Sequence, residues 1–259
     1  MRILVVGATG PLGRALVPRL VESRHVVQEP AGADLRAHDL RALVRGCDAV
    51  VASAVSPATT RRLLHAAVGC GVRRYVQQSF AAIYRDGGDS WLDEDAPIEA
   101  AERRSDPCRS VIETEAAIRQ VDPQTLGWTI LRGGPFVGSG TRQEALIDRL
   151  RSRRAVIEGD GSNYLSPVNV ADMAAAVAAA LRSAPAGSTF NVVDEPLRYS
   201  DYVDALADLI GVERPPRAAV RRRRESRRCT NAAARAALGW MPRHSIWPSR
   251  VDLLAVPRR

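Results

Sequence analysis

Short apolar runs and helix-spaced apolar positions alternate along the first 155 residues. The apolar runs that are typical of buried strands cover 2–6, 25–29, 48–54, 73–78 and 128–132. Between them, apolar residues recur at helical spacing over 11–21, 57–69, 111–121 and 144–153, and a shorter helix is expected from Asp39 to about Gly46. Strands that alternate with helices predict an α/β fold, a Rossmann-type doubly wound parallel sheet with right-handed crossovers.

The pattern changes after residue 155. A glycine turn at 159–162 is followed by a predicted helix over 169–181, a strand over 190–193 and helices over 199–210 and 231–238. We interpret this part as a small α+β lobe over the carboxyl edge of the sheet. The expected division is a sheet domain at 1–155, to which some later segments return, and a lobe at 156–259.

The first apolar run leads directly into a glycine-rich turn, Gly7-Ala8-Thr9-Gly10-Pro11-Leu12-Gly13, and into a helix that starts at Pro11. Gly7 permits a tight turn, Gly10 lets the backbone approach a pyrophosphate, and Gly13 allows close packing of helix and sheet. The N–H groups of the helix N-terminus would face the phosphates. A glycine turn that binds nothing is the alternative, but the strand–turn–helix context favours a dinucleotide, NAD or NADP.

Composition narrows the class of protein without naming a reaction. The 259 residues are 46% hydrophobic and 25% charged, which is ordinary for a soluble domain. No apolar stretch approaches the roughly 18 residues that span a membrane, and the apolar start is too short for a signal peptide. The four cysteines lack C-x-x-C spacing and the four histidines are scattered. We therefore expect a cytoplasmic protein without a metal site or a membrane partner.

All 37 basic residues are arginine, and the sequence contains no lysine. Arginine is spread over most of the chain, and its one cluster is Arg221–Arg224 with Arg227 and Arg228. The cluster is open to three interpretations: a site for an anionic small-molecule substrate, a solvated strand, or a nucleic-acid contact. We rank nucleic acid last, because no aromatic residues interleave with the arginines.

Several further motifs resemble the extended short-chain dehydrogenase/reductases, the NAD-dependent epimerase/dehydratase family. Asp34-Leu35 resembles the pair that borders the adenine, DAVVASA (48–54) the family's DxVxhxA strand, SFAAIY (79–84) its SSxxxY loop, and LRGGPFVG (131–138) the loop beside the nicotinamide. Segments 168–175 and 231–242 resemble two later family motifs. The resemblance implies that the cofactor is held by Gly7, Thr9, Gly10, Pro11, Leu12, Gly13, Asp34, Leu35, Ala52, Ala54, Ser79, Gly134, Pro135 and Phe136.

The choice between the two nicotinamide cofactors depends on the end of the second strand. Glu29 is the acidic residue nearest to the expected ribose 2′-OH, which favours NAD over NADP, although Arg14 or Arg36 could reach a 2′-phosphate. A solvent-facing strand end is the alternative role for Glu29. Only four residues separate Glu29 from Asp34, so a helix and a strand that the family usually has here are predicted to be missing.

The catalytic pair of the family, Y-x-x-x-K, is missing. Its two positions fall near Pro107 and Val111, no tyrosine occurs between Arg85 and Asn163, and lysine is absent from the whole chain. A tyrosine base needs its pKa moved from about 10 towards 7, roughly 4 kcal/mol of differential stabilisation, and arginine cannot share the proton relay as lysine does. Hydride-plus-proton chemistry with the usual residues is therefore not expected.

The residues that could replace the pair are Tyr84 and Ser79, both in the loop expected beside the nicotinamide. For Tyr84 an aromatic packing role is the favoured alternative, and for Ser79 a backbone role beside the cofactor. Weaker candidates are the acidic residues of 86–95, Cys108 and Tyr164, whose ordinary roles are solvation or packing.

We expect an NAD(P)-binding oxidoreductase or epimerase-like enzyme that acts on a small polar substrate with a nonstandard acid/base. The alternatives are a non-redox cyclase, dehydratase or isomerase on the same fold, and a catalytically silent nucleotide-sensing regulator, because fold alone does not decide function. The resemblance also suggests a homodimer with a seam formed by 63–68 and 111–118.

Overall fold

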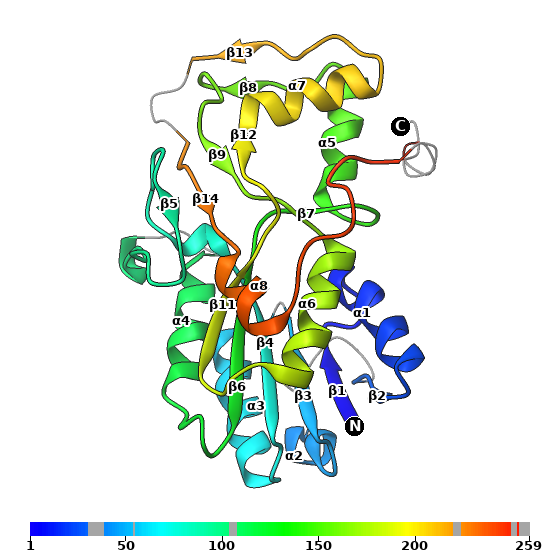
Figure 1. Cartoon of the computed structure of the whole chain (residues 1–259), viewed down its shortest axis with the longest axis vertical. Coiled ribbons are helices and arrows are strands. Elements are labelled where there is room, and N and C mark those ends of the chain that lie inside the picture. Colours follow the sequence, from blue (N-terminus) through cyan, green and yellow to red (C-terminus); the bar gives the residue numbers. More distant parts are fainter. Residues whose placement is uncertain (31–38, 54, 104–107, 220–223, 250–252, 254–259) are drawn as a thin grey trace.

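Six parallel strands form the main sheet, in the order β11-β6-β4-β3-β1-β2 (Figure 1). The computed structural model describes residues 1–30, 39–53, 55–103, 108–219, 224–249 and 253. The strands are β1 (Arg2–Val6), β2 (Val26–Gln28), β3 (Ala49–Ala52), β4 (Arg74–Phe80), β6 (Gly127–Gly133) and β11 (Ser188–Val192). Every neighbouring pair is parallel, so the predicted fold class is confirmed.

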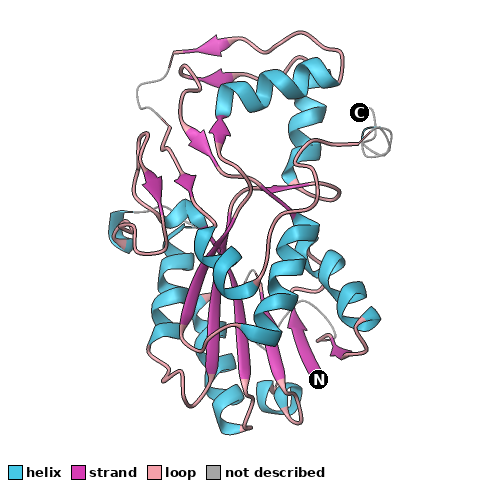
Figure 2. Ribbon diagram, in the orientation of Figure 1, coloured by secondary structure: helices cyan, strands magenta, loops and turns pink. Residues whose placement is uncertain are grey.

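Helices cover both faces of this sheet (Figure 2). One face carries α1 (Pro11–Glu22), α6 (Val170–Ser183) and α8 (Ala232–Leu238), and the other carries α2 (Leu40–Val44), α3 (Pro57–Gly69) and α4 (Cys108–Arg119). The first core contains Leu12, Leu16 and Leu20 against Met173 and Val177. Apolar residues at this spacing form one side of each helix and explain why these segments are helical.

Side-chain caps fix where several of these helices begin. The Ser56 hydroxyl accepts a hydrogen bond from Thr59 N at the start of α3, and the Asn169 side chain accepts one from Ala171 N at the start of α6. Gly239 ends α8 with a φ of 59°, the left-handed conformation that glycine adopts without strain. The helices predicted over 57–69 and 231–238 therefore have the bounds that their flanking residues indicate.

Above the sheet, a smaller region has its own core. It contains α5 (Arg142–Arg151), α7 (Tyr199–Leu209) and two ribbons, β8 (Ile157–Glu158) with β13 (Arg217–Ala218) and β9 (Tyr164–Leu165) with β12 (Leu197–Arg198). Tyr202, Val203 and Leu206 of α7 pack there against Ile157 and Leu150. The strands β7 (Phe136–Val137) and β10 (Val168–Asn169) pair where the chain passes between the two regions.

Segments from both sides of residue 155 contribute to each region. The later elements α6, α8 and β11 lie with the sheet, whereas α5 packs with α7 in the upper region (Figure 1). The division of the chain into domains at residue 155 stays a prediction. Among the described helices, none is both long and apolar enough to cross a membrane.

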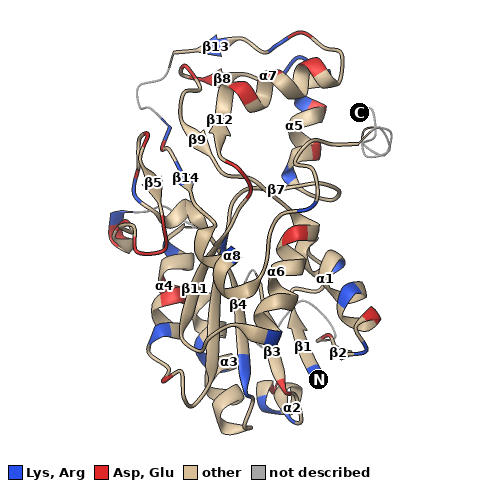
Figure 3. Cartoon of the chain, in the orientation of Figure 1, with Lys and Arg blue, Asp and Glu red and all other residues tan. Residues whose placement is uncertain are grey.

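The segment 85–103 contains two short elements. It contains β5 (Trp91–Leu92), which pairs with β14 (Arg228–Cys229), and a short helix η2 (Ala101–Arg103). Two arginine side chains stack on Tyr164, Arg198 at 4.0 Å and Arg228 at 4.8 Å, and Arg228 also lies 4.4 Å from the Trp91 ring. These cation–π contacts join the acidic loop around β5 (Figure 3) to the upper region.

Candidate functional site

A cleft of about 1070 Å³ lies between the carboxyl ends of the strands and the upper region. The glycine-rich turn contributes Gly7, Thr9, Gly10, Pro11 and Leu12, and the last residues of β4 and β6 with the segments after them contribute 80–83 and 133–137. Elements of the upper region add Arg142, Leu146, Tyr164, Tyr199 and Tyr202. A cleft at the carboxyl edge of a parallel sheet is the usual ligand site of this architecture.

The glycine-rich turn has the geometry that a bound pyrophosphate needs. Gly7 has a φ of 90°, and a Cβ there would lie 2.3 Å from Ser53 Oγ. A Cβ on Gly13 would lie 2.3 Å from the Ala8 Cα atom, so only glycine lets α1 approach the turn this closely. The first hydrogen bond inside α1 runs from Arg14 N to Gly10 O, which leaves the earlier N–H groups for a ligand. These residues fit a dinucleotide.

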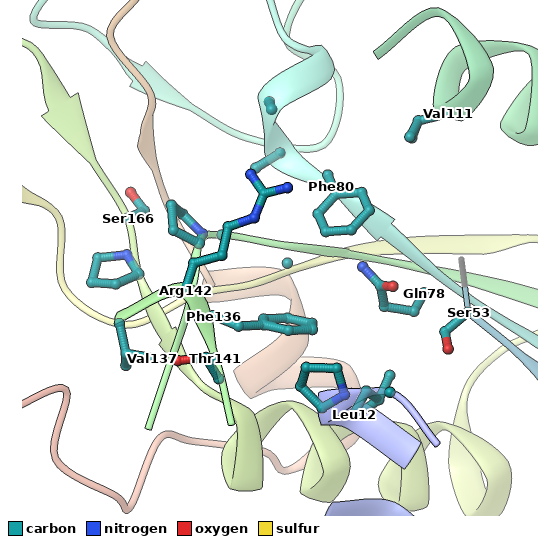
Figure 4. A pocket seen from close by; sticks show the side chains of 18 of the residues that line it. Leu12, Ser53, Gln78, Phe80, Val111, Phe136, Val137, Thr141, Arg142 and Ser166 are labelled. Carbon is teal, nitrogen blue, oxygen red and sulfur yellow. The ribbon is translucent and has the colours of Figure 1, made fainter. Parts of the chain in front are cut away.

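The opposite wall is the loop after β6. A Cβ on Gly134 would lie 1.6 Å from Ser166 O, so this loop and segment 166–167 are in backbone contact. The Phe136 ring lies 6.3 Å from the Phe80 ring, measured between centroids, and Figure 4 shows Phe80, Phe136 and Leu12 around one part of the cleft. This part is therefore walled by apolar and aromatic side chains.

Eight of the fourteen predicted cofactor residues line the cleft: Gly7, Thr9, Gly10, Pro11, Leu12, Gly134, Pro135 and Phe136. Gly13, Ala52 and Ser79 are close by in sequence but do not line it, and the latter two are at most 1% exposed. Asp34, Leu35 and Ala54 lie outside the described residues. Glu29, predicted near the ribose, lines the cleft.

Several lining residues were not predicted from the sequence, among them Ser53, Gln78, Phe80 and Arg142. Ser53, Gln78 and Phe80 lie at or just after the carboxyl ends of β3 and β4. Because parallel strands end at one edge of the sheet, their terminal residues share the cleft, and this positional rule could have found them.

Tyr84 and Ser79, the two candidate acid/base residues, are buried below the cleft and are not part of its lining. The Tyr84 hydroxyl donates a 2.8 Å hydrogen bond to Asn191 Oδ1 and accepts one of 2.9 Å from Arg132 Nη1. The Ser79 hydroxyl donates a 2.6 Å hydrogen bond to Glu115 Oε1. Burial raises the pKa of Tyr84 well above its ordinary value, against the opposing effect of Arg132.

A buried ion pair connects these two residues. The Arg132 guanidinium, 1% exposed, binds Glu115 through contacts of 2.7 Å and 3.0 Å. Burial acts to lower the pKa of Arg132, but its hydrogen bonds to Glu115 and the charge of that residue more than offset this and raise the pKa. Arg132 Nη1 also donates to Glu94 O at 3.1 Å. We call Ser79, Tyr84, Glu115, Arg132 and Asn191 the buried network.

Of the two positions predicted for the family's tyrosine and lysine, Pro107 and Val111, the second lies in the first turn of α4. Val111 lines the cleft, as does Cys108, whereas Pro107 lies outside the described residues. Neither valine nor a cysteine thiol supplies the paired tyrosine–lysine proton relay. The described residues at this wall therefore contain no equivalent of that pair.

Two of the three described arginines of the predicted anion-binding cluster have carboxylate partners within the chain. Arg224 pairs with Glu158 at 2.9 Å and Arg227 with Glu225 at 2.6 Å, while 221–223 lie outside the described residues. Within the part of the chain that the structure describes, no group of three or more His, Cys, Asp or Glu side chains could hold a metal ion.

The sequence matches a family model described as NAD(P)H-binding over residues 28–184, which is more than half of the chain. A curated relative, the 3-diazoavenalumate denitrifying reductase of a Streptomyces species, is 30% identical over an alignment 304 positions long, which covers 95% of this chain and 98% of the relative.

Solved structures share the fold along nearly the whole chain. MoeE5 in complex with UDP-glucuronic acid and NAD superposes with a TM-score of 0.79 at 23% identity, over 99% of this chain and 97% of that one. The dTDP-glucose 4,6-dehydratase DesIV of Streptomyces venezuelae, a double mutant with NAD bound, gives 0.80 at 20% identity, over 99% and 95%. With the cleft, the family model and the reductase relative in agreement, the chain belongs to the NAD(P)H-binding family, and its fold is that of the solved MoeE5 and DesIV structures.

Proposed function

We propose that the protein is an NAD(P)H-dependent reductase that replaces the diazo group of a small organic molecule by hydrogen, that the group reacts as its diazonium form R–N₂⁺, and that the protein supplies no proton donor beside the nicotinamide. The coarser part, a reductase, follows the relative with which the chain aligns over 95% of its length. The finer part, the diazo substrate, follows the name of that relative and the chemistry of the cleft.

The observation that carries this proposal is the composition of the wall at α4. A carbonyl that accepts a hydride becomes an alkoxide and needs a proton. In the extended short-chain dehydrogenase/reductases that the sequence resembles, the tyrosine–lysine pair supplies this proton. Here Cys108 and Val111 line that wall, and Tyr84 is fully buried with both hydrogen-bond partners inside the protein. A substrate whose reduction consumes no proton fits these residues.

A diazonium group meets that requirement. When bound, the nicotinamide cofactor supplies a hydride, that is, a proton with two electrons. The substrate R–N₂⁺ gains a C–H bond, the C–N bond breaks, and its electron pair leaves with N₂. The products are R–H, N₂ and the oxidised cofactor, so atoms, charge and electrons balance without an acid or a base.

The chain's own residues would bind, orient and exclude water. The backbone of Gly7, Gly10 and the first turn of α1 would hold the pyrophosphate, and Glu29 would accept hydrogen bonds from a ribose. Phe80 and Phe136 would cover the reacting end and keep water away from it.

The direct test incubates the full-length protein with 3-diazoavenalumate and NADH or NADPH, and measures cofactor oxidation, N₂ release and the denitrified product. Oxidised cofactor, N₂ and denitrified product are expected in equimolar amounts. Cofactor binding without N₂ release would reject the diazo substrate, and a lack of binding to both cofactors up to millimolar concentration would reject the reductase itself.

In the same assay we expect Tyr84→Phe to keep its turnover. A general acid contributes about 100- to 10,000-fold to a rate, so a loss within about tenfold excludes Tyr84 as the proton donor and a larger loss would reinstate it. The substitution removes the hydroxyl between Arg132 and Asn191 and should lower the free energy of unfolding by about 1–3 kcal/mol, measured by urea denaturation.

A further inference from the structure

Arg142 is a cation in the cleft whose side chain has no partner among the described residues. It is the first residue of α5, its side chain is exposed, and it lines the cleft. Figure 4 shows the side chain reaching into the cleft on the side of Phe80. Among the described residues, its guanidinium makes no hydrogen bond, ion pair or ring contact. A guanidinium in this position is free to bind an anion that enters from outside.

The other two arginines of the cleft lining differ in this respect. Arg224 binds Glu158 and lies over the Tyr199 ring, and Arg227 binds Glu225 and the Ser226 carbonyl oxygen. Their charges are balanced within the chain, and their side chains are held in place. Among the described arginines of the cleft lining, Arg142 is the one whose charge a ligand's anion would meet without breaking an existing ion pair.

The wall next to Arg142 suits a flat apolar group. The Phe80 side chain is 37% exposed although it is a large apolar residue, and it stands beside Phe136. Ala81, Ala82 and Ile83 continue the same wall. An exposed aromatic ring in a cleft binds a ligand ring by stacking or edge contact.

We propose that Arg142 anchors the carboxylate of an aromatic substrate whose ring lies against Phe80, and so determines which molecules the cleft accepts. This rests on the proposed reductase function and specifies its substrate class as aryl carboxylates. The planar guanidinium can bind a carboxylate through two parallel hydrogen bonds. The apolar wall reduces the local dielectric screening, which strengthens the attraction.

The test uses cinnamate and cinnamamide as probes, two ligands of the same shape that differ in charge. Each is titrated by calorimetry into the complex of the full-length protein with NADH. The wild type is expected to bind cinnamate more tightly than cinnamamide. Arg142→Gln should weaken cinnamate binding about 10- to 100-fold, the range for hydrogen bonds to a charged group, and leave cinnamamide binding unchanged.

The matched control is Arg149→Gln, which removes an equal charge from an exposed position of α5 outside the cleft lining. It should not change the binding of either probe. Arg142→Lys keeps the charge but cannot form the two parallel hydrogen bonds. Its affinity for cinnamate should lie between those of the wild type and the glutamine variant. Phe80→Ala should weaken the binding of both probes equally.

The proposal is overturned if the wild type binds both probes equally, or if Arg142→Gln leaves cinnamate binding intact. Those results would not affect the reductase function, because NADH affinity and N₂ release are measured separately. In the reverse result, Arg142→Gln loses the preference for the carboxylate probe but the wild type releases no N₂. This result would support the role of Arg142 and reject the diazo reaction.

Discussion

Glu115→Ala is expected to lower the free energy of unfolding by about 3–5 kcal/mol, because it leaves the Arg132 guanidinium charged and buried without its counter-ion. Glu115 also accepts a hydrogen bond from the Ser79 hydroxyl. The substitution therefore leaves Ser79 on β4 and Arg132 on β6 without their hydrogen-bond acceptor. Urea denaturation of the full-length protein, followed by circular dichroism, measures the change.

Two further variants separate the buried charge from a general effect on α4. Glu113→Gln breaks the exposed ion pair with Arg109 on the same helix and should lower the free energy of unfolding by less than about 1 kcal/mol. The double variant Glu115→Leu with Arg132→Met removes both charges and should be more stable than Glu115→Ala alone. Equal losses for Glu113→Gln and Glu115→Ala would show that the buried network contributes little.

Gly13→Ala is expected to disrupt both the fold of the glycine-rich turn and cofactor binding. The added Cβ would lie 2.3 Å from the Ala8 Cα and carbonyl oxygen atoms, so α1 must move away from the turn. Overpacking of this kind lowers the free energy of unfolding by roughly 1–3 kcal/mol. Because the N-terminus of α1 is displaced, the affinity of the protein for NADH should fall as well. Thermal unfolding and NADH fluorescence titration measure the two effects.

Gly10→Ala distinguishes the two roles of the turn. Its φ of −74° suits alanine, and the nearest atom to the added Cβ, Gly7 O, is at 3.4 Å. Stability should therefore stay close to that of the wild type. Because Gly10 lines the cleft, NADH affinity should fall at least about tenfold, which is about 1.4 kcal/mol of binding free energy. Unchanged NADH affinity in Gly10→Ala would mean that the pyrophosphate does not lie on this turn.

The sheet and its helices were predictable because their signals are local. The apolar runs at 2–6 and 48–54 became β1 and β3, and the helix predicted to start at Pro11 became α1. The glycine-rich turn was predictable for the same reason, since its geometry depends on the positive φ of Gly7 and on the absence of a Cβ at Gly13. The loss of a helix and a strand after Glu29 stays a prediction, because residues 31–38 lie outside the described part of the chain.

The surroundings of Tyr84 were not predictable from the sequence. Its partners Arg132 and Asn191 lie on β6 and β11, and they become neighbours only when the sheet forms. The pairing of β5 with β14, more than 130 residues apart, depends equally on tertiary structure. Arg142 carries no motif at all, because an exposed arginine at a helix start is ordinary until the cleft around it is known.

The position of a deuterium label tests the central claim most directly. The protein is given 3-diazoavenalumate with NADH that carries deuterium at both C4 positions of the nicotinamide, in ordinary water, and the product is analysed by mass spectrometry and NMR. One deuterium is expected on the carbon that lost N₂, and a parallel reaction with unlabelled NADH in D₂O should leave that carbon unlabelled. Deuterium from D₂O at that carbon, with none from the cofactor, would contradict direct hydride delivery in this cleft.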